Sequence, residues 1–333
     1  MDGGARAAVE RCGPAGASSQ QGATQMIKDF VSIADFSPRQ LRLLLERAID
    51  EKELFRKGEL AASCKGKVLA LIFEKPSLRT RVSFEAAITQ LGGGAISLTD
   101  ADIGLGKREP VADVAAVLGR MCDAVAARTF SHDTVVGLAE HCAVPVINAL
   151  SDLSHPCQAM ADVMTAMERL GDIAGAKWAF IGDGNNVALS LAVVCAKLGM
   201  QFALACPDGY DLDRDALAAL PGGQVGYTRT DKPSEAVAGA SVIYTDTWVS
   251  MGQEAEKAKR IEAFKGYQVD DELVAAAPAG VLVMHCLPAY RGYEISESVM
   301  AAHADTIFAQ AANRLHFQRA LLNVLIADGG IAE

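Results

Sequence analysis

Short apolar runs alternate with helical stretches along almost the whole chain, and this alternation constrains the fold more than any other feature. The runs typical of strands are KVLALIF, AISL, AVAAR, PVINAL, KWAFIG, QFALAC, VGYT, SVIYT and VLVMHC. A strong helix is predicted at 37–55, because Ser37 and Gln40 form a capping-box pattern around Pro38. Strands that alternate with helices predict βα units and mostly parallel sheets. The helical stretch 155–173 near mid-chain predicts a bridge between two α/β domains.

Length and charge exclude several classes of protein. A chain of 333 residues is long for one core and predicts two domains of about 150 residues each. The net charge of −10 argues against a nucleic-acid binder, whose surface would be basic. The longest apolar stretch, 187–196, is too short to span a bilayer and predicts a buried helix. We therefore expect no nucleic-acid partner and no membrane, and any anion site must be local.

The N-terminus and the cysteines bear on localisation. Residues 1–25 are rich in Gly, Ala, Ser and Gln without the apolar core of a signal peptide, so we expect a disordered extension. A cleaved organelle-targeting segment is the alternative. The eight cysteines form no CxxC pair, which predicts reduced, mostly buried thiols in a cytoplasmic protein. No histidine lies at HExxH spacing, and we expect no metal site.

Polar or reactive groups follow several of the predicted strands. Arg128 ends AVAAR, His155 follows PVINAL, GDGNN follows KWAFI, Asp246 follows SVIYT, and Cys286 closes VLVMHC. In open α/β sheets ligands bind beyond the carboxyl ends of the strands. These positions therefore predict a ligand-binding cleft between the two domains.

The stretch FEKPSLRTRVSFE, 73–85, allows two interpretations. Ser77 suits a helix N-cap, so the segment could be only a solvated turn and a capped helix start. A helix N-terminus with hydroxyl and guanidinium groups also suits a phosphate or a similar dianion. Likewise, HPCQ begins a predicted helix with Pro156, which brings His155 and Gln158 to one face. We favour a functional role for His155 over a simple cap.

Three further motifs each allow a structural and a functional interpretation. GDGNN lacks the third glycine of a dinucleotide-binding loop, and its asparagines could simply cap the next helix. DTWVSMGQE could be a fixed connector, or a lid whose Asp246 and Ser250 recognise an amino acid, with Gly252 allowing closure. In HCLP, a nucleophilic Cys286 is the less favoured role, because neighbouring His285 should point to the opposite face of the strand.

Together the motifs SLRTR, HPCQ, GDGNN, DTWVSMG, HCLPA and AANRLHFQ resemble those of the ornithine carbamoyltransferases in order and approximate spacing. The resemblance covers nearly everything after residue 26. It implies transfer of the carbamoyl group from carbamoyl phosphate to the δ-amine of L-ornithine, which gives citrulline and phosphate in arginine biosynthesis or a urea-cycle type step. It also implies no cofactor, and a homotrimer or a multiple of trimers, with the loop 98–113 reaching a neighbouring subunit.

The resemblance further implies roles for individual residues. The implied catalytic residues are Arg128, His155 and Cys286. The implied carbamoyl phosphate contacts are Ser77, Leu78, Arg79, Thr80, Arg128, His155, Gln158, Cys286, Leu287 and Arg314. The implied ornithine contacts are Asn186, Asp246, Ser250 and Met251. Residues 26–155 are expected to form the carbamoyl phosphate-binding domain, with helix 308–328 packed back on it, and residues 156–307 the ornithine-binding domain.

The sequence departs from this family at two positions. Leu78 stands where Thr is common, which removes a hydroxyl and leaves a backbone N–H for phosphate. Gly104 stands where a His or Gln often reaches the neighbouring subunit, and Lys75, Lys107 or Arg108 could compensate. The alternatives to the ornithine reaction are a carbamoyltransferase for putrescine or N-acylated ornithine, and a catalytically silent regulatory homologue.

Overall fold

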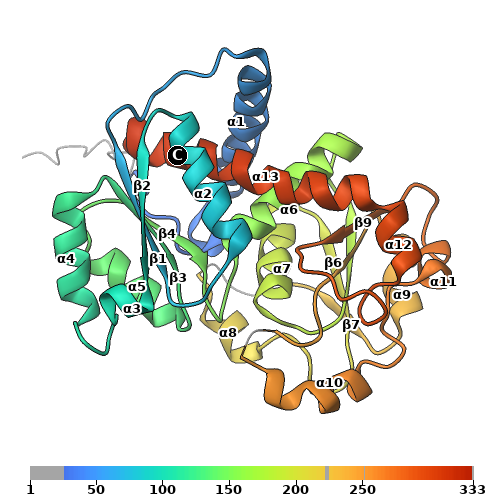
Figure 1. Ribbon diagram of the computed structural model, residues 1–333. Helices are drawn as coiled ribbons and strands as arrows, with labels where there is room; N and C mark the ends of the chain where they lie inside the picture. Colours follow the sequence, from blue (N-terminus) through green and yellow to red (C-terminus); the bar gives the residue numbers. More distant parts are fainter. Residues whose placement is uncertain (1–25, 222–224, 251, 332–333) are drawn as a thin grey trace, which may run out of the picture.

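The protein is described here by a computed structural model, which covers residues 26–221, 225–250 and 252–331. Two α/β domains lie side by side, each built on its own parallel sheet (Figure 1). The predicted fold class is therefore confirmed. The extension predicted for 1–25 lies outside the described residues, and the exact domain bounds stay a prediction.

The first domain has a four-stranded sheet in the order β2-β1-β3-β4. Its strands are β1 (Val68–Phe73), β2 (Gly94–Thr99), β3 (Ala124–Arg128) and β4 (Val146–Leu150). Its helical elements are η1 (Ile33–Asp35), α1 (Pro38–Lys57), α2 (Leu78–Gln90), α3 (Asp100–Ile103), α4 (Val111–Met121) and α5 (His132–His141). The capping box predicted for α1 is confirmed, with Ser37 and Gln40 bonded reciprocally. Strand β3 is wholly buried, as expected for a parallel sheet covered on both faces.

The second domain has a five-stranded parallel sheet in the order β7-β6-β5-β8-β9. Its strands are β5 (Lys177–Ile181), β6 (Gln201–Ala205), β7 (Thr228–Thr230), β8 (Val242–Thr245) and β9 (Leu282–His285). Its helical elements are α7 (Asn186–Leu198), α8 (Arg214–Ala219), α9 (Pro233–Val237), η2 (Glu254–Glu256), α10 (Lys257–Ala263), α11 (Asp271–Ala275) and α12 (Glu297–Ala302).

One predicted strand is misplaced. The run VGYT, 225–228, enters the sheet only with its last residue, and the strand is Thr228–Thr230. This strand pairs with β6 alone at the edge of the sheet, and its side chains are exposed or half-buried. An edge strand with so little burial does not need apolar residues. The apolar run 225–228 therefore predicted the strand too early in the chain.

Two long helices join the domains. Helix α6 (Pro156–Leu170) follows β4, and α13 (Ala304–Leu322), which continues into η3 (Asn323–Ala327), packs on α1, α2, α6 and β9. Figure 1 shows α13 crossing from one domain to the other. One hydrophobic core includes Leu69 of the first sheet and Trp178 of the second. The cavity described below therefore lies between two sheets that share packing.

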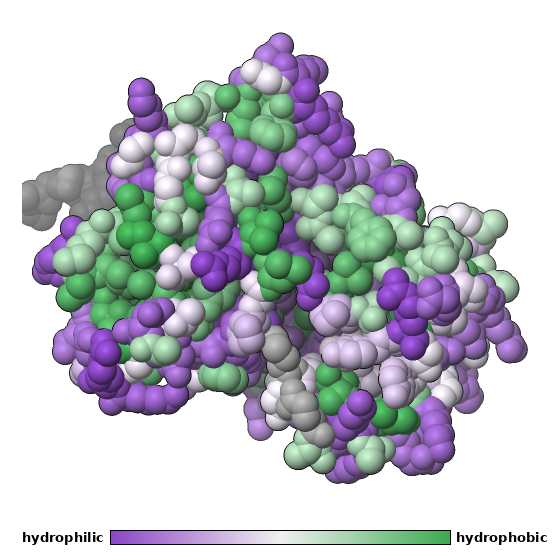
Figure 2. Space-filling view, in the orientation of Figure 1, coloured by the Kyte–Doolittle hydropathy of each residue, from purple (hydrophilic) through white to green (hydrophobic). Residues whose placement is uncertain are grey.

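Three further features concern membrane spans, exposed apolar residues and cysteines. None of the helices in the described ranges combines the length and apolar character that a membrane span requires. Apolar side chains gather on the face of the first domain seen in Figure 2, and four of its exposed apolar residues are Leu78, Val82, Val117 and Met121. The cysteines within the described residues are free thiols, and all of these except Cys122 are buried.

Candidate active site

The carboxyl ends of strands from both sheets surround one cavity of about 320 Å³. Figure 2 shows the surface hollowed where the two domains meet. Residues that follow β3, β4, β5, β8 and β9 line the cavity, as predicted from the polar groups at these strand ends. Parallel strands place their carboxyl ends at one edge of a sheet, and the two edges face each other here.

The structure brings together nearly all the residues that the sequence singled out. Those that line the cavity are Ser77, Leu78, Arg79, Arg128, His155, Gln158, Asn186, Asp246, Ser250, Cys286, Leu287 and Arg314. Thr80 lies just behind the wall, fully buried, and its hydroxyl accepts a hydrogen bond from Arg314 Nη2 at 2.8 Å. Met251 lies outside the described residues.

Guanidinium groups crowd the end of the cavity formed by the first domain. Ser77 caps α2, because its hydroxyl accepts from the Thr80 N–H at 3.3 Å, and the positive end of the helix dipole lies here. Burial, with Arg314 and Arg79 nearby, lowers the pKa of Arg128 to about 10. The Nε atoms of Arg128 and Arg314 are buried, and neither has a hydrogen-bond partner among the residues that the structure describes. Cations that lack partners in a buried place favour an anionic ligand.

His155 lies beside this cluster as a neutral base. It precedes α6 as the N-cap residue without a side-chain capping bond, and its backbone N–H donates to Ser190 Oγ at 2.8 Å. Burial, then Arg314 and Arg128, holds the pKa of His155 well below its usual value. Its Nδ1 is buried and has no partner within the described protein. A neutral imidazole with a free nitrogen can bind a polar ligand without adding charge.

Asp246 organises the end of the cavity formed by the second domain. Its Oδ2 accepts from Asn185 Nδ2 at 2.8 Å, and its Oδ1 accepts from Cys286 Sγ at 2.9 Å and from the Thr247 N–H at 2.8 Å. Asn185 also caps α7, so the capping interpretation of GDGNN is correct for this residue. The Asn186 side chain donates to the Ser151 carbonyl at 2.7 Å. This end therefore carries an acceptor already held by protein donors.

Cys286 is a thiol, not a thiolate. Burial and the Asp246 carboxylate raise its pKa well above the usual value. His285 cannot remove its proton, because His285 Nδ1 accepts from the Leu287 N–H at 2.9 Å and Nε2 donates to Glu294 at 3.1 Å. The donor atoms of Asp246, His285 and Cys286 lie within 4.8 Å of one another, but these hydrogen bonds already engage them. This arrangement disfavours the covalent cysteine mechanism.

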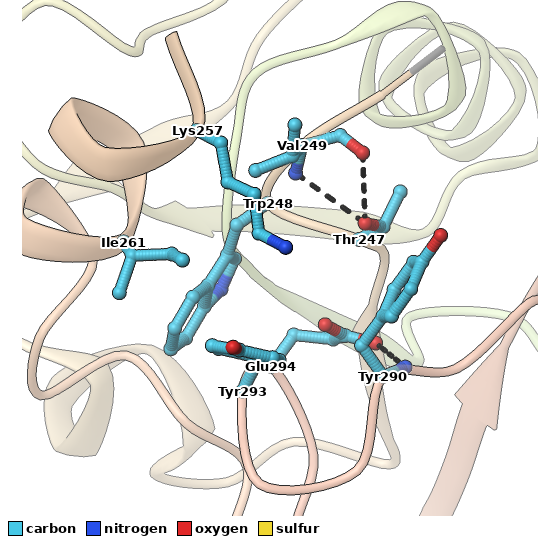
Figure 3. A pocket seen from close by; sticks show the side chains of 8 residues that line it. All are labelled: Thr247, Trp248, Val249, Lys257, Ile261, Tyr290, Tyr293 and Glu294. Carbon is cyan, nitrogen blue, oxygen red and sulfur yellow. Dashed lines mark hydrogen bonds between the residues drawn. The ribbon is translucent and has the colours of Figure 1, made fainter. Parts of the chain in front are cut away.

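In the loop after β8, residues 247–249 are held by hydrogen bonds and ring packing. Figure 3 shows Thr247 Oγ1 bonded to both the N–H and the carbonyl of Val249, and Trp248 beside Lys257 and Ile261 of α10. Trp248 also stacks on Phe264 with ring centroids 5.7 Å apart. The small pocket in this figure has about 140 Å³, less than half the volume of the main cavity. Loop closure stays a prediction.

The two departures from the family pattern have clear positions. Gly104 ends α3 with φ of +62°, a conformation that favours glycine. Lys107 and Arg108 pair with Asp100 and Glu109 within the same loop. Lys75 alone of the three proposed substitutes lines the cavity. Its ammonium lies 4.7 Å from the centre of the Phe130 ring, and burial followed by Arg128 lowers its pKa.

Sequence reasoning missed the groups that hold these side chains. Asn185 holds Asp246, and Asp162 accepts a hydrogen bond from Gln158 Nε2 at 2.7 Å. The second contact had a signal, since Gln158 and Asp162 are four residues apart on one helix face. The contact between Asn185 and Asp246 had no signal in the sequence, because it joins two segments that become neighbours only through the strand order of the sheet.

The cavity between the two α/β domains has buried guanidinium groups at one end and the Asp246 carboxylate at the other. This arrangement is typical of an enzyme that brings an anionic group donor to a second small substrate. Two family models then match the chain: "Aspartate/ornithine carbamoyltransferase, carbamoyl-P binding domain" over residues 28–168, and "Aspartate/ornithine carbamoyltransferase, Asp/Orn binding domain" over residues 174–325. The chain belongs to the aspartate/ornithine carbamoyltransferase family.

Individual relatives agree with this family. The chain is 46% identical over 303 residues to the ornithine carbamoyltransferase of Anoxybacillus flavithermus, covering 90% of this chain and 96% of the relative. It is 47% identical over 300 residues to the anabolic ornithine carbamoyltransferase of Pseudomonas aeruginosa, covering 90% and 97%. The solved structure of the Pyrococcus furiosus ornithine carbamoyltransferase is similar with a TM-score of 0.85 and 43% identity, covering 92% and 99%.

Proposed function

We propose that this protein transfers the carbamoyl group of carbamoyl phosphate to the δ-amine of L-ornithine, which yields L-citrulline and phosphate. The observation that carries the proposal is a single cavity with unpartnered guanidinium atoms at one end and Asp246 at the other. Membership of the family and the names of the relatives support it. The reaction belongs to arginine biosynthesis or a urea-cycle type step.

The phosphate end supplies binding and electrostatics. Ser77, Leu78, Arg79 and Thr80 at the start of α2, together with Arg314, hold the phosphate by hydrogen bonds and charge. Gln158 and the Leu287 carbonyl receive the carbamoyl nitrogen. Arg128, His155 and the Thr80 hydroxyl stabilise the negative charge that grows on the carbonyl oxygen during attack. The Thr80 hydroxyl is available as a donor, because its oxygen already accepts from Arg314.

The chemistry needs little else. The neutral δ-amine attacks the carbonyl carbon, the bond from that carbon to the phosphate oxygen breaks, and the leaving phosphate accepts a proton from the new amide nitrogen. The nearby guanidinium groups favour the neutral amine, because like charges disfavour the ammonium form. Alignment of an already activated donor then provides much of the rate. Cys286 orients the reactants as a neutral thiol.

The second end provides specificity. Asp246, Asn186, Ser250 and the Met251 backbone hold the α-amino and α-carboxylate groups of ornithine. Putrescine lacks the carboxylate, so it would leave polar groups unpaired, and discrimination on this basis reaches about 10⁴-fold. We therefore expect ornithine to be preferred over putrescine by orders of magnitude. N-acylated ornithine would lack the free α-amine that Asp246 binds.

A citrulline-forming assay with carbamoyl phosphate and ornithine tests the proposal. We expect citrulline and phosphate in equal amounts, and little product with putrescine or N-acetylornithine under the same conditions. Equal use of putrescine would contradict the ornithine assignment. No turnover with any of the three amines would favour the silent homologue.

We also propose a cytoplasmic homotrimer, or a multiple of trimers. Exposed apolar residues on the first domain support an interface there, since large exposed apolar patches mark interaction sites. The loop 98–113 is the segment that reaches the neighbouring subunit in the family. Light scattering coupled to size exclusion should give three times the chain mass or a multiple of that value, and a monomer at micromolar concentration would contradict this.

A further inference from the structure

Behind the cavity lies a buried carboxylate that accepts three hydrogen bonds. Asp162 on α6 is fully buried, as are Gln310 on α13 and Tyr244 on β8. Asp162 Oδ1 accepts from Gln158 Nε2 at 2.7 Å and from Gln310 Nε2 at 2.7 Å. Its Oδ2 accepts from the Tyr244 hydroxyl at 3.0 Å. Groups from three elements of the two-domain junction therefore converge on one side chain.

Asp162 decides which way the Gln158 amide faces. A carboxylate oxygen can only accept, so the Gln158 atom that meets it at 2.7 Å must be the NH₂ group. Gln158 Oε1 is then turned away from Asp162; it is buried without a partner, and Gln158 lines the cavity. A buried acceptor without a partner is costly unless a ligand donates to it. The site therefore presents an acceptor where a ligand N–H would satisfy it.

This orientation does not depend on the ionisation of Asp162. Burial raises the pKa of Asp162 to about 7, while its hydrogen bonds oppose the rise. A proton on Oδ2 can be donated to the Tyr244 hydroxyl, which also accepts from Gln310 Nε2 at 3.2 Å. Oδ1 then still accepts from both amides. Gln158 Oε1 is therefore turned away from Asp162 in either state.

We propose that Asp162 is a positioning residue that makes Gln158 an acceptor for the carbamoyl N–H, and so selects a carbamoyl donor over an acyl phosphate of the same shape. Acetyl phosphate has a methyl group where carbamoyl phosphate has NH₂. The methyl group would leave Gln158 Oε1 unsatisfied. This inference rests on the proposed function, because it assigns one step of donor recognition within that reaction.

The same carboxylate links the donor end to the reacting centre. Gln310 Nε2 bonds Asp162, and Gln310 Oε1 accepts from the His285 N–H at 3.0 Å. His285 precedes Cys286, so one buried chain of hydrogen bonds runs from Gln158 to the end of β9. Because Asp162 Oδ1 accepts from both Gln158 and Gln310 inside the protein, the orientation of the Gln158 amide is set before the ligand binds.

The test separates the carbamoyl group from the phosphate group. In Asp162→Ala, the Gln158 amide loses the acceptor that orients it, so the KM for carbamoyl phosphate should rise about 10-fold. The inhibition constants of inorganic phosphate and acetyl phosphate, measured against carbamoyl phosphate, should stay within about twofold because neither ligand donates an N–H to Gln158. A variant with a generally damaged site would bind all three more weakly. Equal weakening of all three, or no change in any, would overturn the proposal.

Two matched variants serve as controls. Asp162→Asn keeps an oxygen toward the two amides and turns its NH₂ toward Tyr244, so it should restore the wild-type KM for carbamoyl phosphate. Tyr244→Phe removes the partner of Oδ2 and leaves the Gln158 contact, so its KM should also stay within about threefold of wild type. Loss of carbamoyl phosphate binding in both would show that the whole network supports the site, and would overturn a specific role for Asp162.

A measurement on the wild-type protein covers the case in which Asp162→Ala does not fold. Neutron diffraction from deuterium-exchanged crystals should place two deuterium atoms on the Gln158 atom that faces Asp162. Deuterium on the atom facing the cavity would overturn the proposal. This result does not depend on turnover, so failure of the citrulline assay would count against the proposed function alone.

Discussion

The two ends of the cavity solve opposite electrostatic problems. At the first-domain end, Arg128 and Arg314 have buried N–H groups without partners among the described residues. Burial, followed by Arg314 and Arg79, lowers the pKa of Arg128, and burial, with Arg79 nearby, lowers the pKa of Arg314. At the second-domain end, Asp246 already accepts from Asn185, Cys286 and its own loop. The guanidinium groups at the first end gain hydrogen-bond partners only when an anion binds. At the second end, Asp246 must give up hydrogen bonds to protein donors before it can bind the ligand. Affinity for the donor should therefore depend on charge, and affinity for the amine on geometry.

The largest expected effect on activity comes from removing Arg128, a cation at the first-domain end of the cavity. Arg128→Met should lower kcat/KM by about 10³-fold or more, because the variant loses the oxyanion donor that we propose Arg128 to be. The same variant should unfold about 2–4 °C higher, since a buried cation without a partner is replaced by an apolar side chain. Steady-state kinetics and calorimetry test both. Arg120→Met, at an exposed position of α4, is the control. An Arg128→Met variant that is less stable than wild type yet active would contradict both expectations.

The next largest effect should come from removing Asp246 at the second-domain end of the cavity. Asp246→Ala should raise the KM for ornithine about 100-fold and leave the KM for carbamoyl phosphate within about threefold, because the proposed role of Asp246 is to contact only the amine substrate. The preference for ornithine over putrescine should shrink in parallel. Asp208→Ala, an exposed carboxylate paired with Arg229, is the control. A matching rise in both KM values would show that the two ends are not separate.

A smaller effect is expected at the thiol between the two ends. Cys286→Ser keeps a donor toward Asp246, so turnover should fall only about 10-fold. Mass spectrometry during turnover should detect no carbamoylated cysteine, because the raised pKa keeps the group a thiol. The half-buried Cys122 provides the control variant, Cys122→Ser. An adduct that forms and decays at the catalytic rate would contradict direct transfer.

The smallest effect concerns pH and stability. The folded pKa of His155 is depressed, so below about pH 6.5 the unfolded chain takes up a proton that the folded protein does not. Stability is then lost as pH falls, by up to about 1.4 kcal/mol per pH unit from this group. His155→Gln should lose less stability than wild type between pH 7 and 5.5 in thermal unfolding. An equal loss of stability in both proteins would show that His155 does not cause this pH dependence.

Much of the fold and the cavity followed from local patterns. The period of apolar residues placed the strands, apart from the edge strand at 228–230, and the capping box placed the start of α1. Polar residues after successive strands indicated the cavity, because parallel strands bring these positions to one edge. The roles assigned to those residues came from the family resemblance and stay predictions for this chain.

The sequence by itself determined the alternation of strands and helices and the positions of the polar strand ends. Only the tertiary structure decided which strands are neighbours. The order β5-β8-β9 places Asn185, Asp246 and Cys286 together although they are far apart in the chain. Helix α13 likewise brings Arg314 to Thr80 and Gln310 to Asp162. Such contacts arise from the packing of the whole core, which no local pattern of residues encodes.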